Sequence, residues 1–560
     1  MTNRCRVVAS IVLLIMGSGC SSGGPANGVP SGATITGPAL PTVSASPSAS
    51  PSAAASRSAP TPTPTATSTP VAGLLPPVSP AYYAAARFLD QATWGARQAD
   101  AASLESVGIA KWLTTQFALP PSALQPVPAG YIGAQWTPDN LVYNALTGPD
   151  QLRQRIAFAL STILTVSCLQ PLPNCSEMPN YWGVLERDAF ANYLTILHDI
   201  TLNPQMGEFL DLLNNSESTS GASPNENYAR ELLQLMTIGT VLLNQDGSPV
   251  LDSNGRPVAA YTDSDVRALA RVFTGWTYAA ADPLSSPLVA NEQAHDTGAK
   301  TVLGSPLAPG QTAEQDLDQA LQVIFDNQNV GPFLALRLIQ HFVKSDPTPS
   351  YIDRVASVFA NDGTGTRGNM KAVVAAVLTD PEARAGDDPA LASANDGHLR
   401  EPMLYMTAVL RALGAVMDPD FTQVQPAGGI QTMGERVDLP PSVFSFYSPF
   451  YSLSDGKIPA PEFQLLTSSN AVAQASVIWS LLLNNGVNPP FTIPMGPFVS
   501  AATNPVNLLA TVDLLFTRGA MPVEMQRSIL GAIDATSDPV QRAQTALFLV
   551  ATSGLFRVIR

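Results

Sequence analysis

Apolar residues recur every three or four positions along most of this 560-residue chain. That spacing places them on one side of an α-helix. From residue 81 onward the pattern predicts one helix after another, with Pro, Gly, Asn and Asp at the breaks. The predicted helices cover residues 82–92, 110–119, 149–166, 181–202, 206–213, 263–276, 314–327, 332–343, 351–359, 370–379, 401–413, 463–483, 506–516 and 540–550.

Strand patterns are sparse. Asp246-Gly247 and Asn254-Gly255 are turn sequences, and they predict one or two small β-hairpins between residues 241 and 258, with a further short strand at 301–303. The fold class is therefore mainly α: a multi-helix globular domain. A chain of this length exceeds what one hydrophobic core usually supports, so we expect two lobes, at residues 81–300 and 301–560.

Residues 223–239 gather much of the polar chemistry of the chain. Ser223 is placed as a helix N-cap, with Pro224 as the first helical residue, where its missing N–H costs nothing. Gly239 is placed to end the helix in a left-handed conformation. Glu226 and Arg230 stand one turn apart on the predicted helix, so they face each other.

The candidate catalytic side chains are Asp211, Glu226, Arg230, Glu231 and His295. A carboxylate among them could be a general acid or base, with Arg230 tuning its pKa or holding an anionic substrate. His295 lies in an irregular segment and could shuttle protons or join the carboxylates in a metal site. The alternative is a buried ion-pair network joining this helix to the one that carries Arg153 and Arg155.

Motifs for a bound metal or cofactor are missing from the sequence. Its four histidines are not clustered and form no HExxH pair, so no metal is assigned. Neither a phosphate loop nor Gly-x-Ser-x-Gly is present, so no cofactor is expected.

The N-terminus predicts export. Arg4 and Arg6 precede an apolar run at residues 7–16, which is too short to span a membrane and is typical of a signal peptide over residues 1–20. Cys20 follows Gly19 as in the lipidated N-terminus of bacterial lipoproteins; ordinary cleavage nearby is the alternative. Residues 21–80 are rich in Ser, Ala, Pro and Thr and cannot bury enough apolar surface to fold, so they form a disordered tether.

Charge and cysteine content agree with an exported protein. Only 13% of residues are charged, and the net charge of −15 argues against a nucleic-acid partner. Cys168 and Cys175 bracket a short loop, which favours a disulfide in an oxidising compartment over a free thiol pair. Residues 444–451 hold five aromatic side chains, which form either a buried wedge between the lobes or an exposed platform for sugar rings or a partner.

Several stretches carry a family resemblance. They are Pro-Asn-Glu-Asn-Tyr-Ala-Arg-Glu-Leu-Leu at 224–233 and segments at 86–95, 150–160, 270–276, 295–301, 400–402 and 446–449. In this order they resemble the bacterial family called domain of unknown function 1800, from about residue 81 to the end. The resemblance implies no activity, because the family is named for lacking one.

We therefore expect an exported protein, lipid-anchored in the cell membrane or outer membrane, that binds or assembles an extracellular polymer or envelope protein. The alternative is a hydrolase of envelope polymers that uses a carboxylate pair. The two functions predict different arrangements, because a hydrolase requires Glu226, Glu231 and His295 to meet in a cleft that solvent reaches. A dry, fully paired network would favour the binding module.

Overall fold

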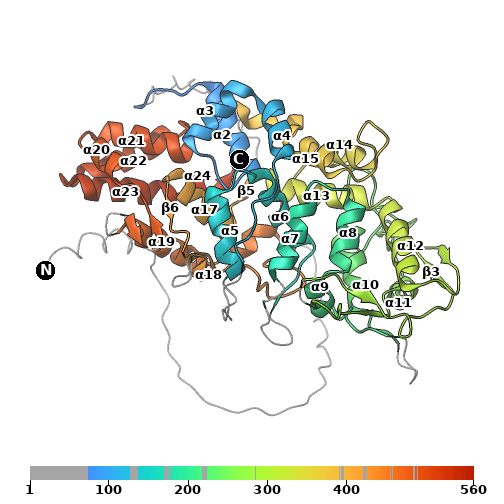
Figure 1. Ribbon diagram of the computed structural model, residues 1–560. Helices are drawn as coiled ribbons and strands as arrows, with labels where there is room; N and C mark the ends of the chain where they lie inside the picture. Colours follow the sequence, from blue (N-terminus) through green and yellow to red (C-terminus); the bar gives the residue numbers. More distant parts are fainter. Residues whose placement is uncertain are drawn as a thin grey trace, which may run out of the picture. The chain divides into compact units, whose positions relative to one another are not determined.

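The computed structural model describes residues 74–126, 136–168, 175, 178–216, 223–283, 285–389, 391, 396–420, 426–453, 456, 458–483, 486–488 and 490–560. Helices dominate this part of the chain and the strands are short (Figure 1), so the predicted mainly α fold is confirmed. The predicted signal peptide, Cys20 and residues 21–73 of the predicted tether lie outside the described residues.

Many helices begin where a side chain caps them or where a proline takes the first turn. The hydroxyl of Ser79 accepts the N–H of Tyr82 at the start of the first described helix. Thr262 and Thr312 each form a capping box with the residue three positions on. These contacts satisfy N–H groups that have no partner within the helix. Local sequence therefore sets many of the boundaries.

The first half of the described chain contains α2 (Pro80–Ala92), α3 (Gln98–Val107), α4 (Ile109–Ala118), α5 (Trp136–Thr147), α6 (Gln151–Ile163), α7 (Met178–Asp188), α8 (Tyr193–Thr201), α9 (Pro204–Phe209), α10 (Asn227–Glu231), η2 (Leu232–Thr237) and α11 (Asp263–Val272). Next come α12 (Ala313–Asp326), α13 (Val330–Phe342), α14 (Pro349–Ala360), α15 (Met370–Thr379), α16 (Pro381–Arg384) and η3 (Ala385–Asp387). The last group is α17 (Pro402–Ala412), α18 (Gly428–Thr432), η4 (Pro461–Leu465), α19 (Ser468–Leu482), α20 (Gly496–Ala501), α21 (Pro505–Val512), η6 (Asp513–Thr517), α22 (Val523–Asp534), α23 (Pro539–Ala551) and α24 (Gly554–Arg557).

The strands form small antiparallel sheets. They are β1 (Trp276–Thr277) with β2 (Val289–Ala290), β3 (Lys300–Val302) with β4 (Ser305–Leu307), β5 (His398–Leu399) with β11 (Val558–Ile559), β7 (Ser452–Leu453) with β8 (Ile458–Pro459), and β10 (Phe491–Thr492) between β6 (Val416–Met417) and β9 (Val487–Asn488). The predicted short strand at 301–303 is β3. In the predicted hairpin region, isolated bridges such as Val241 to Ala259 replace full strands.

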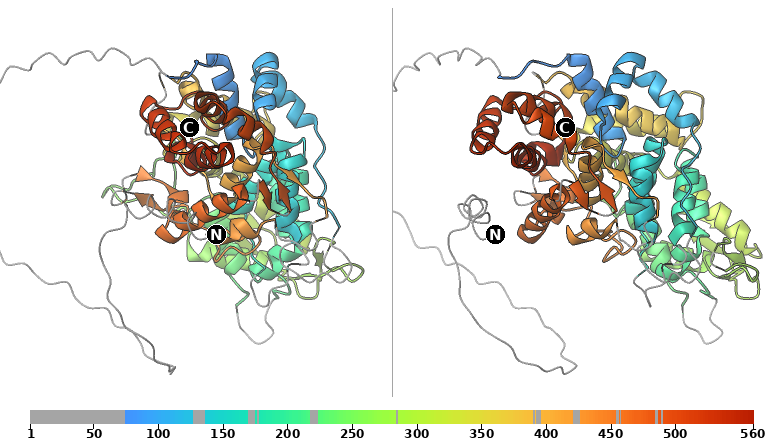
Figure 2. Two further views of the ribbon diagram at one scale, coloured as in Figure 1. Left: turned by 90° about the vertical axis from the view of Figure 1, so that its left-hand side faces the viewer. Right: turned by 60° about the vertical axis from the view of Figure 1, so that its left-hand side comes forward.

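Three helices lie at the centre of the described chain. Nearly every residue of α6, α13 and α17 is buried. The remaining helices pack around them, with α20 to α23 forming a group of their own (Figure 2). One continuous hydrophobic core runs from Ala85 to Ile559, and residues 70–560 form one compact unit. The predicted division into lobes at residue 300 stays a prediction.

The C-terminal segment returns to the first described helix. Strand β11 pairs with β5 and also lies against α2, so the blue and red ends of the folded unit meet (Figure 1). The N–H of Arg400 is bonded to the carbonyl of Arg557 at 2.7 Å, which fixes this closure.

The predicted and observed helices differ mainly where a tertiary contact interrupts a good pattern. The single helix predicted over 181–202 is two helices, α7 and α8. Asn192 caps α8, and its amide also donates to the carbonyl of Arg367 at 2.6 Å. That contact with a distant segment fixes the break. Among the described helices of at least ten residues, α3, α5 and α22 were not predicted.

Candidate functional site

The helix in residues 223–239 begins three residues later than predicted. Helix α10 starts at Asn227, and Ser223 is not its N-cap. The side chain of Asn225 accepts the N–H of Asn227 at 2.8 Å, and Asn215 bonds both the N–H and the carbonyl of Asn225. Asparagine side chains compete with helical hydrogen bonds in this way. The predicted N-cap at Ser223 was therefore wrong.

Directly after α10 the helix widens into the π-helix η2. The hydroxyl of Thr237 donates to the carbonyl of Leu232, five residues back, at 2.5 Å. Gly239 then ends the helix at φ +71°, as predicted. Such π-turns are rare and often occur at functional sites. Here the turn carries Leu235 to the wall of a surface pocket.

The charged residues of α10 are more exposed than predicted. Glu226 and Arg230 form an ion pair at 2.7 Å, with side chains 29% and 40% exposed. Asp211 has a left-handed backbone (φ +59°) and accepts the amide of Asn227 at 3.2 Å. Partial burial raises the pKa of Glu231, whose Oε2 has no hydrogen-bond partner among the described residues.

The predicted ion-pair network between this helix and α6 was wrong. Arg153 donates instead to the main-chain carbonyls of Glu186 at 2.8 Å and Leu119 at 2.9 Å. Arg155 donates to the carbonyl of His341 at 3.1 Å, and burial lowers its pKa to about 10. Both guanidinium groups therefore tie loops and helix ends together.

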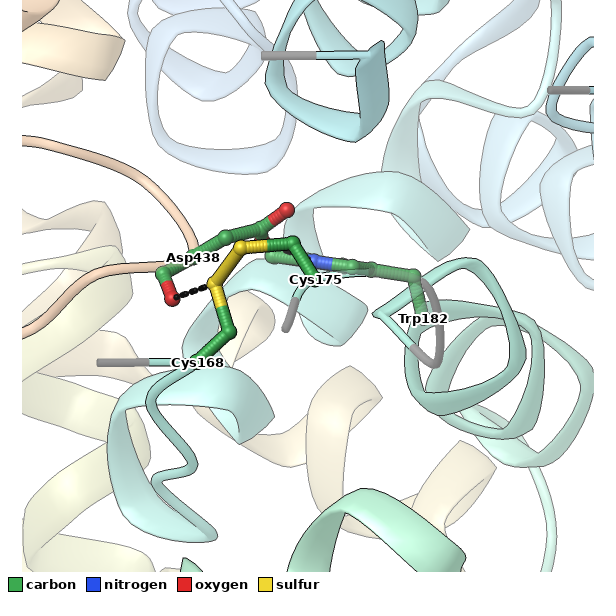
Figure 3. Close-up of a disulfide and its surroundings, with 4 residues drawn as sticks. All are labelled: Cys168, Cys175, Trp182 and Asp438. Atoms are coloured by element: carbon green, nitrogen blue, oxygen red, sulfur yellow. Dashed lines mark hydrogen bonds between the residues drawn. A yellow bond between two sulfur atoms is a disulfide. The ribbon is translucent and has the colours of Figure 1, made fainter. Parts of the chain in front are cut away.

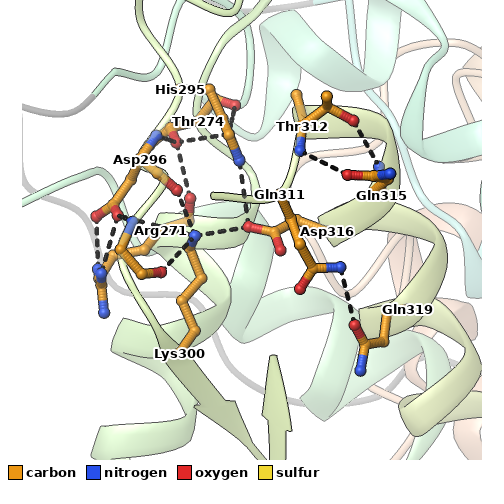
Figure 4. Close-up of polar contacts among 12 residues, drawn as sticks. Arg271, Thr274, His295, Asp296, Lys300, Gln311, Thr312, Gln315, Asp316 and Gln319 are labelled. Carbon is orange, nitrogen blue, oxygen red and sulfur yellow. Dashed lines mark hydrogen bonds and ion pairs between the residues drawn. The ribbon is translucent and has the colours of Figure 1, made fainter. Parts of the chain in front are cut away.

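His295 belongs to a separate, sealed network (Figure 4). Its Nε2 lies 3.1 Å from the carboxylate of Asp316, which also accepts a hydrogen bond from Lys300 at 2.6 Å. Its Nδ1 lies 2.9 Å from the carbonyl of Thr274. The three charged side chains are at most 1% exposed.

Hydrogen bonds offset the effect of burial on the charged groups of this network. Burial lowers the pKa of His295, but the hydrogen bonds to Asp316 and Thr274 outweigh that effect and raise it overall. Asp296, next in the chain, takes a two-pronged contact from Arg271 at 2.5 and 2.8 Å. No hydrogen bond or ion pair among the described residues joins His295 to Asp211, Glu226, Arg230 or Glu231. The five predicted residues therefore do not form one site.

A pocket that the sequence did not predict lies between α6, α13 and residues 443–449. It has a cavity volume of about 30 Å³, and its polar lining includes Thr162, Arg337, His341 and Tyr447. His341 Nε2 lies 2.7 Å from the hydroxyl of Thr162, and its Nδ1 lies 3.8 Å from Glu401. The apolar helical pattern of residues 332–343 favours a core role for His341. The sequence signal closest to this pocket was the family-like segment 446–449.

Part of the aromatic loop, residues 444–451, lines this pocket, through Phe444, Ser445, Tyr447 and Pro449. Arg337 donates to the carbonyl of Pro449 at 2.9 Å, and its guanidinium lies 5.2 Å from the ring of Phe450. Tyr447 is buried, whereas Phe450 is 54% exposed and Phe444, Phe446 and Tyr451 are half-buried. Of the five aromatic side chains in this loop, Phe450 alone is exposed, and the buried wedge between two lobes stays a prediction.

Below the pocket lies a group of buried acids. Burial raises the pKa of Tyr447, Glu435 and Glu462, and the neighbouring Glu401 raises it further in each case. Glu435 accepts the N–H of Met403 at 2.7 Å, at the start of α17. Glu435 thus anchors the start of α17, and Glu462 accepts the N–H of Leu399 at 3.0 Å shortly before that helix.

The predicted disulfide is present (Figure 3). Cys168 and Cys175 are bonded, and the main-chain carbonyl of Asp438 accepts the N–H of Cys168 at 3.0 Å. The carboxylate of Asp438 accepts the indole N–H of Trp182 at 2.7 Å. The bridge closes a short loop after α6, and the hydrogen bonds to Asp438 join this segment to a distant loop.

The described residues include neither a metal-binding cluster nor a membrane-spanning helix. Within those ranges, no group of three or more His, Cys, Asp or Glu side chains is arranged to hold a metal ion. No described helix has both the length and the apolar character needed to cross a membrane.

Comparison with known proteins gives one result. The sequence profile of a family described as "protein of unknown function (DUF1800)" matches residues 87–558. No curated protein matches the chain. No solved structure matches it either.

Proposed function

Since the chain belongs to the DUF1800 family, whose description assigns no activity, we propose a function from the geometry: an exported, surface-anchored module that binds an extracellular polymer through the aromatic loop. The observation that carries the proposal is the concentration of aromatic rings in the loop beside the pocket, where Phe450 is 54% exposed and Phe444, Phe446 and Tyr451 are partly exposed. The apolar face of a sugar ring packs well against such a ring.

Neighbouring side chains hold the aromatic loop in a fixed conformation. Arg337 lies beneath it and contacts both Phe450 and Phe333 within 5.3 Å. The side-chain amide of Gln464 accepts the N–H of Ser448 at 2.7 Å. A loop that is already ordered loses little conformational entropy when it binds a ligand.

The environment of His295 favours binding over hydrolysis at the residues predicted from sequence. A proton shuttle must reach its substrate, and this side chain has no exposed surface. Glu226 is already paired with Arg230. Only the network of His295, Asp316 and Lys300 is dry, as expected of a binding module, whereas Glu226 and Arg230 are partly exposed.

Export and anchoring belong to the same proposal. Lipid on Cys20 and a tether over residues 21–80 would hold the folded part away from the membrane, at up to about 3 Å per residue. The disulfide supports an oxidising compartment. Mass spectrometry of the mature N-terminus should find a diacylglyceryl cysteine; an N-terminus beyond Cys20 would contradict the anchor.

The binding proposal is tested by co-sedimentation of the purified protein with insoluble peptidoglycan, cellulose and chitin. We expect one of these polymers to retain the protein, and Phe450→Ala to weaken retention about tenfold. Leu251→Ala is the matched control, because Leu251 is also 54% exposed but lies in the hairpin region. Retention of none, or equal retention of both variants, would refute the proposal.

The environment of Glu231 favours one alternative function, a hydrolase of envelope polymers in which Glu231 acts with Glu226 or Asp211. Its raised pKa and unpartnered oxygen are features of a general acid. An ester and glycoside substrate screen tests this alternative. Activity that Glu231→Gln abolishes, with an unchanged melting temperature, would establish the hydrolase. Loss of stability without any activity would assign Glu231 a structural role.

A further inference from the structure

Three arginines line a second cavity, away from the aromatic loop. The cavity has a volume of about 90 Å³ and lies where α2, the segment after η6 and the α24–β11 end of the chain meet. Its polar lining is Tyr83, Arg87, Thr517, Arg518 and Arg560. In Figure 1 these elements are the blue α2 and the red segment around α24.

The arginine side chains at this cavity carry more positive charge than their carboxylate partners neutralise. Arg87 pairs with Asp387 at 2.8 Å, but Asp387 also pairs with Arg384 at 3.3 Å. Arg518 pairs with Asp90, and Arg400 shares that carboxylate at 3.0 Å. Arg560 forms no ion pair with any described side chain. Five guanidinium groups thus share two side-chain carboxylates in a protein whose net charge is −15.

Each lining arginine also keeps an unused hydrogen-bond donor. The Nε atoms of Arg87, Arg518 and Arg560 are buried and have no hydrogen-bond partner in the described part of the chain. A buried charged donor without an acceptor is costly, because its hydration is lost and nothing replaces it. Burial and the neighbouring Arg87 and Arg560 guanidinium groups lower the pKa of Arg518 to about 10, although nearby tyrosines act in the opposite direction.

We propose that this cavity binds a tetrahedral oxyanion, a phosphate or sulfate group, either as a free ion or as the end of a larger molecule. Donors that come from three elements suit an anion with several oxygen atoms, and guanidinium groups bind such oxygens with two N–H groups at once. The volume is about three times that of a water molecule in the liquid, which accommodates a small oxyanion. The site is independent of the aromatic loop.

The bound oxyanion would clamp the two ends of the folded unit together. Arg87 comes from α2, Arg518 from the end of η6, and Arg560 follows β11. A ligand that binds only the folded state stabilises it in proportion to the logarithm of its concentration. The melting temperature should therefore rise with the concentration of the oxyanion.

The test measures melting temperature and heats of binding for the whole protein in sodium phosphate, sodium sulfate and sodium chloride at matched ionic strength. Flotation with phosphatidylcholine vesicles, with and without phosphatidic acid, tests a lipid phosphate as the source. We expect phosphate or sulfate, but not chloride, to raise the melting temperature, or the phosphatidic acid vesicles to bind. A positive result with the ions or with the vesicles supports the site if Arg560→Gln weakens it.

The decisive variant is Arg560→Gln, because Arg560 has no described salt bridge whose loss would disturb folding. It should weaken oxyanion binding about tenfold to a hundredfold. Arg256→Gln, which removes an exposed charge in the hairpin region, is the matched control and should bind as the unaltered protein does. Equal responses in chloride and phosphate with no vesicle binding, or an unchanged response in Arg560→Gln, would overturn the proposal.

Discussion

Asp438 combines several constraints at a single residue. Its backbone is left-handed (φ +72°), its carbonyl accepts the N–H of Cys168, and its buried carboxylate accepts the indole N–H of Trp182. Burial raises its pKa to about 7, although the hydrogen bonds to Trp182 and Thr137 oppose that shift. Burial likewise raises the pKa of Asp139 to about 7 and of Glu186 to about 8.

These buried acids predict stability that falls as pH rises. An unfolded carboxyl group has a pKa of about 4, so the folded state holds these protons more tightly. The stabilisation is complete below about pH 4 for each group and is lost as pH rises through about 7 to 8. Urea unfolding midpoints should therefore fall between about pH 5 and pH 8, apart from changes due to other groups.

Asp438→Asn isolates one contribution to this pH dependence. An amide keeps the acceptor for Trp182 and tolerates the left-handed backbone, but it does not titrate. At about pH 8 the variant should be more stable than the parent by about 1–3 kcal/mol, while near pH 4 the two should be alike. A parallel pair of stability–pH curves would show that Asp438 is not protonated in the folded state at neutral pH.

The residue types in the sequence predicted which side chains can pair or react, but not how exposed those side chains are in the fold. Cys168 and Cys175 were predicted correctly as a disulfide, because a short loop brings two thiols together. Arg230 was assigned to a buried network, yet it is 40% exposed, so its ion pair contributes less than about 1 kcal/mol. His341 was assigned to the core, and only the fold shows that it borders a pocket.

At the scale of elements, the turn η2 and its terminal glycine illustrate the limits of sequence patterns. Gly239 was predicted from its position at the end of an apolar stripe, and its φ of +71° agrees. The widened π-turn before it was not predicted, since the same apolar spacing fits an ordinary α-helix. The caps at Thr262 and Thr312 depend on neighbouring residues, so they can be predicted from local sequence. The break at Asn192 depends on a contact with a distant segment, so it cannot.

Two glycine substitutions should act in opposite directions. Gly239→Ala forces a Cβ into a left-handed position, 3.4 Å from the ring of Phe333, and should cost about 1–2 kcal/mol. Gly531→Ala lies within helix α22 with open space around it, and should stabilise by about 0.5–1 kcal/mol. Chemical denaturation of both variants gives the comparison. Destabilisation by Gly531→Ala as large as that by Gly239→Ala would show that the left-handed conformation is not what matters.

For the whole molecule, closure depends on the final strand. Val558 and Ile559 pair with β5, and Ile559 is buried. Deleting residues 558–560 would expose the edge of β5 and open the core beside α2. We expect a large loss of soluble protein and a lower melting temperature, whereas Arg560→Gln should leave the yield unchanged. Normal yield after the deletion would show that β11 is dispensable.

The meeting of α2 with β11 also has a consequence for how the protein matures. Synthesis proceeds from the N-terminus, so α2 leaves the ribosome long before its partners at residues 558–560 exist. The amide of Gln91 in α2 reaches the carbonyl of Arg560 at 3.3 Å, a contact between residues 469 positions apart. Closure over such a sequence distance is slow, and a chain that has not yet closed exposes apolar surface to proteases and to aggregation. The nascent chain cannot bury the exposed face of α2 against β11 until residues 558–560 have been synthesised.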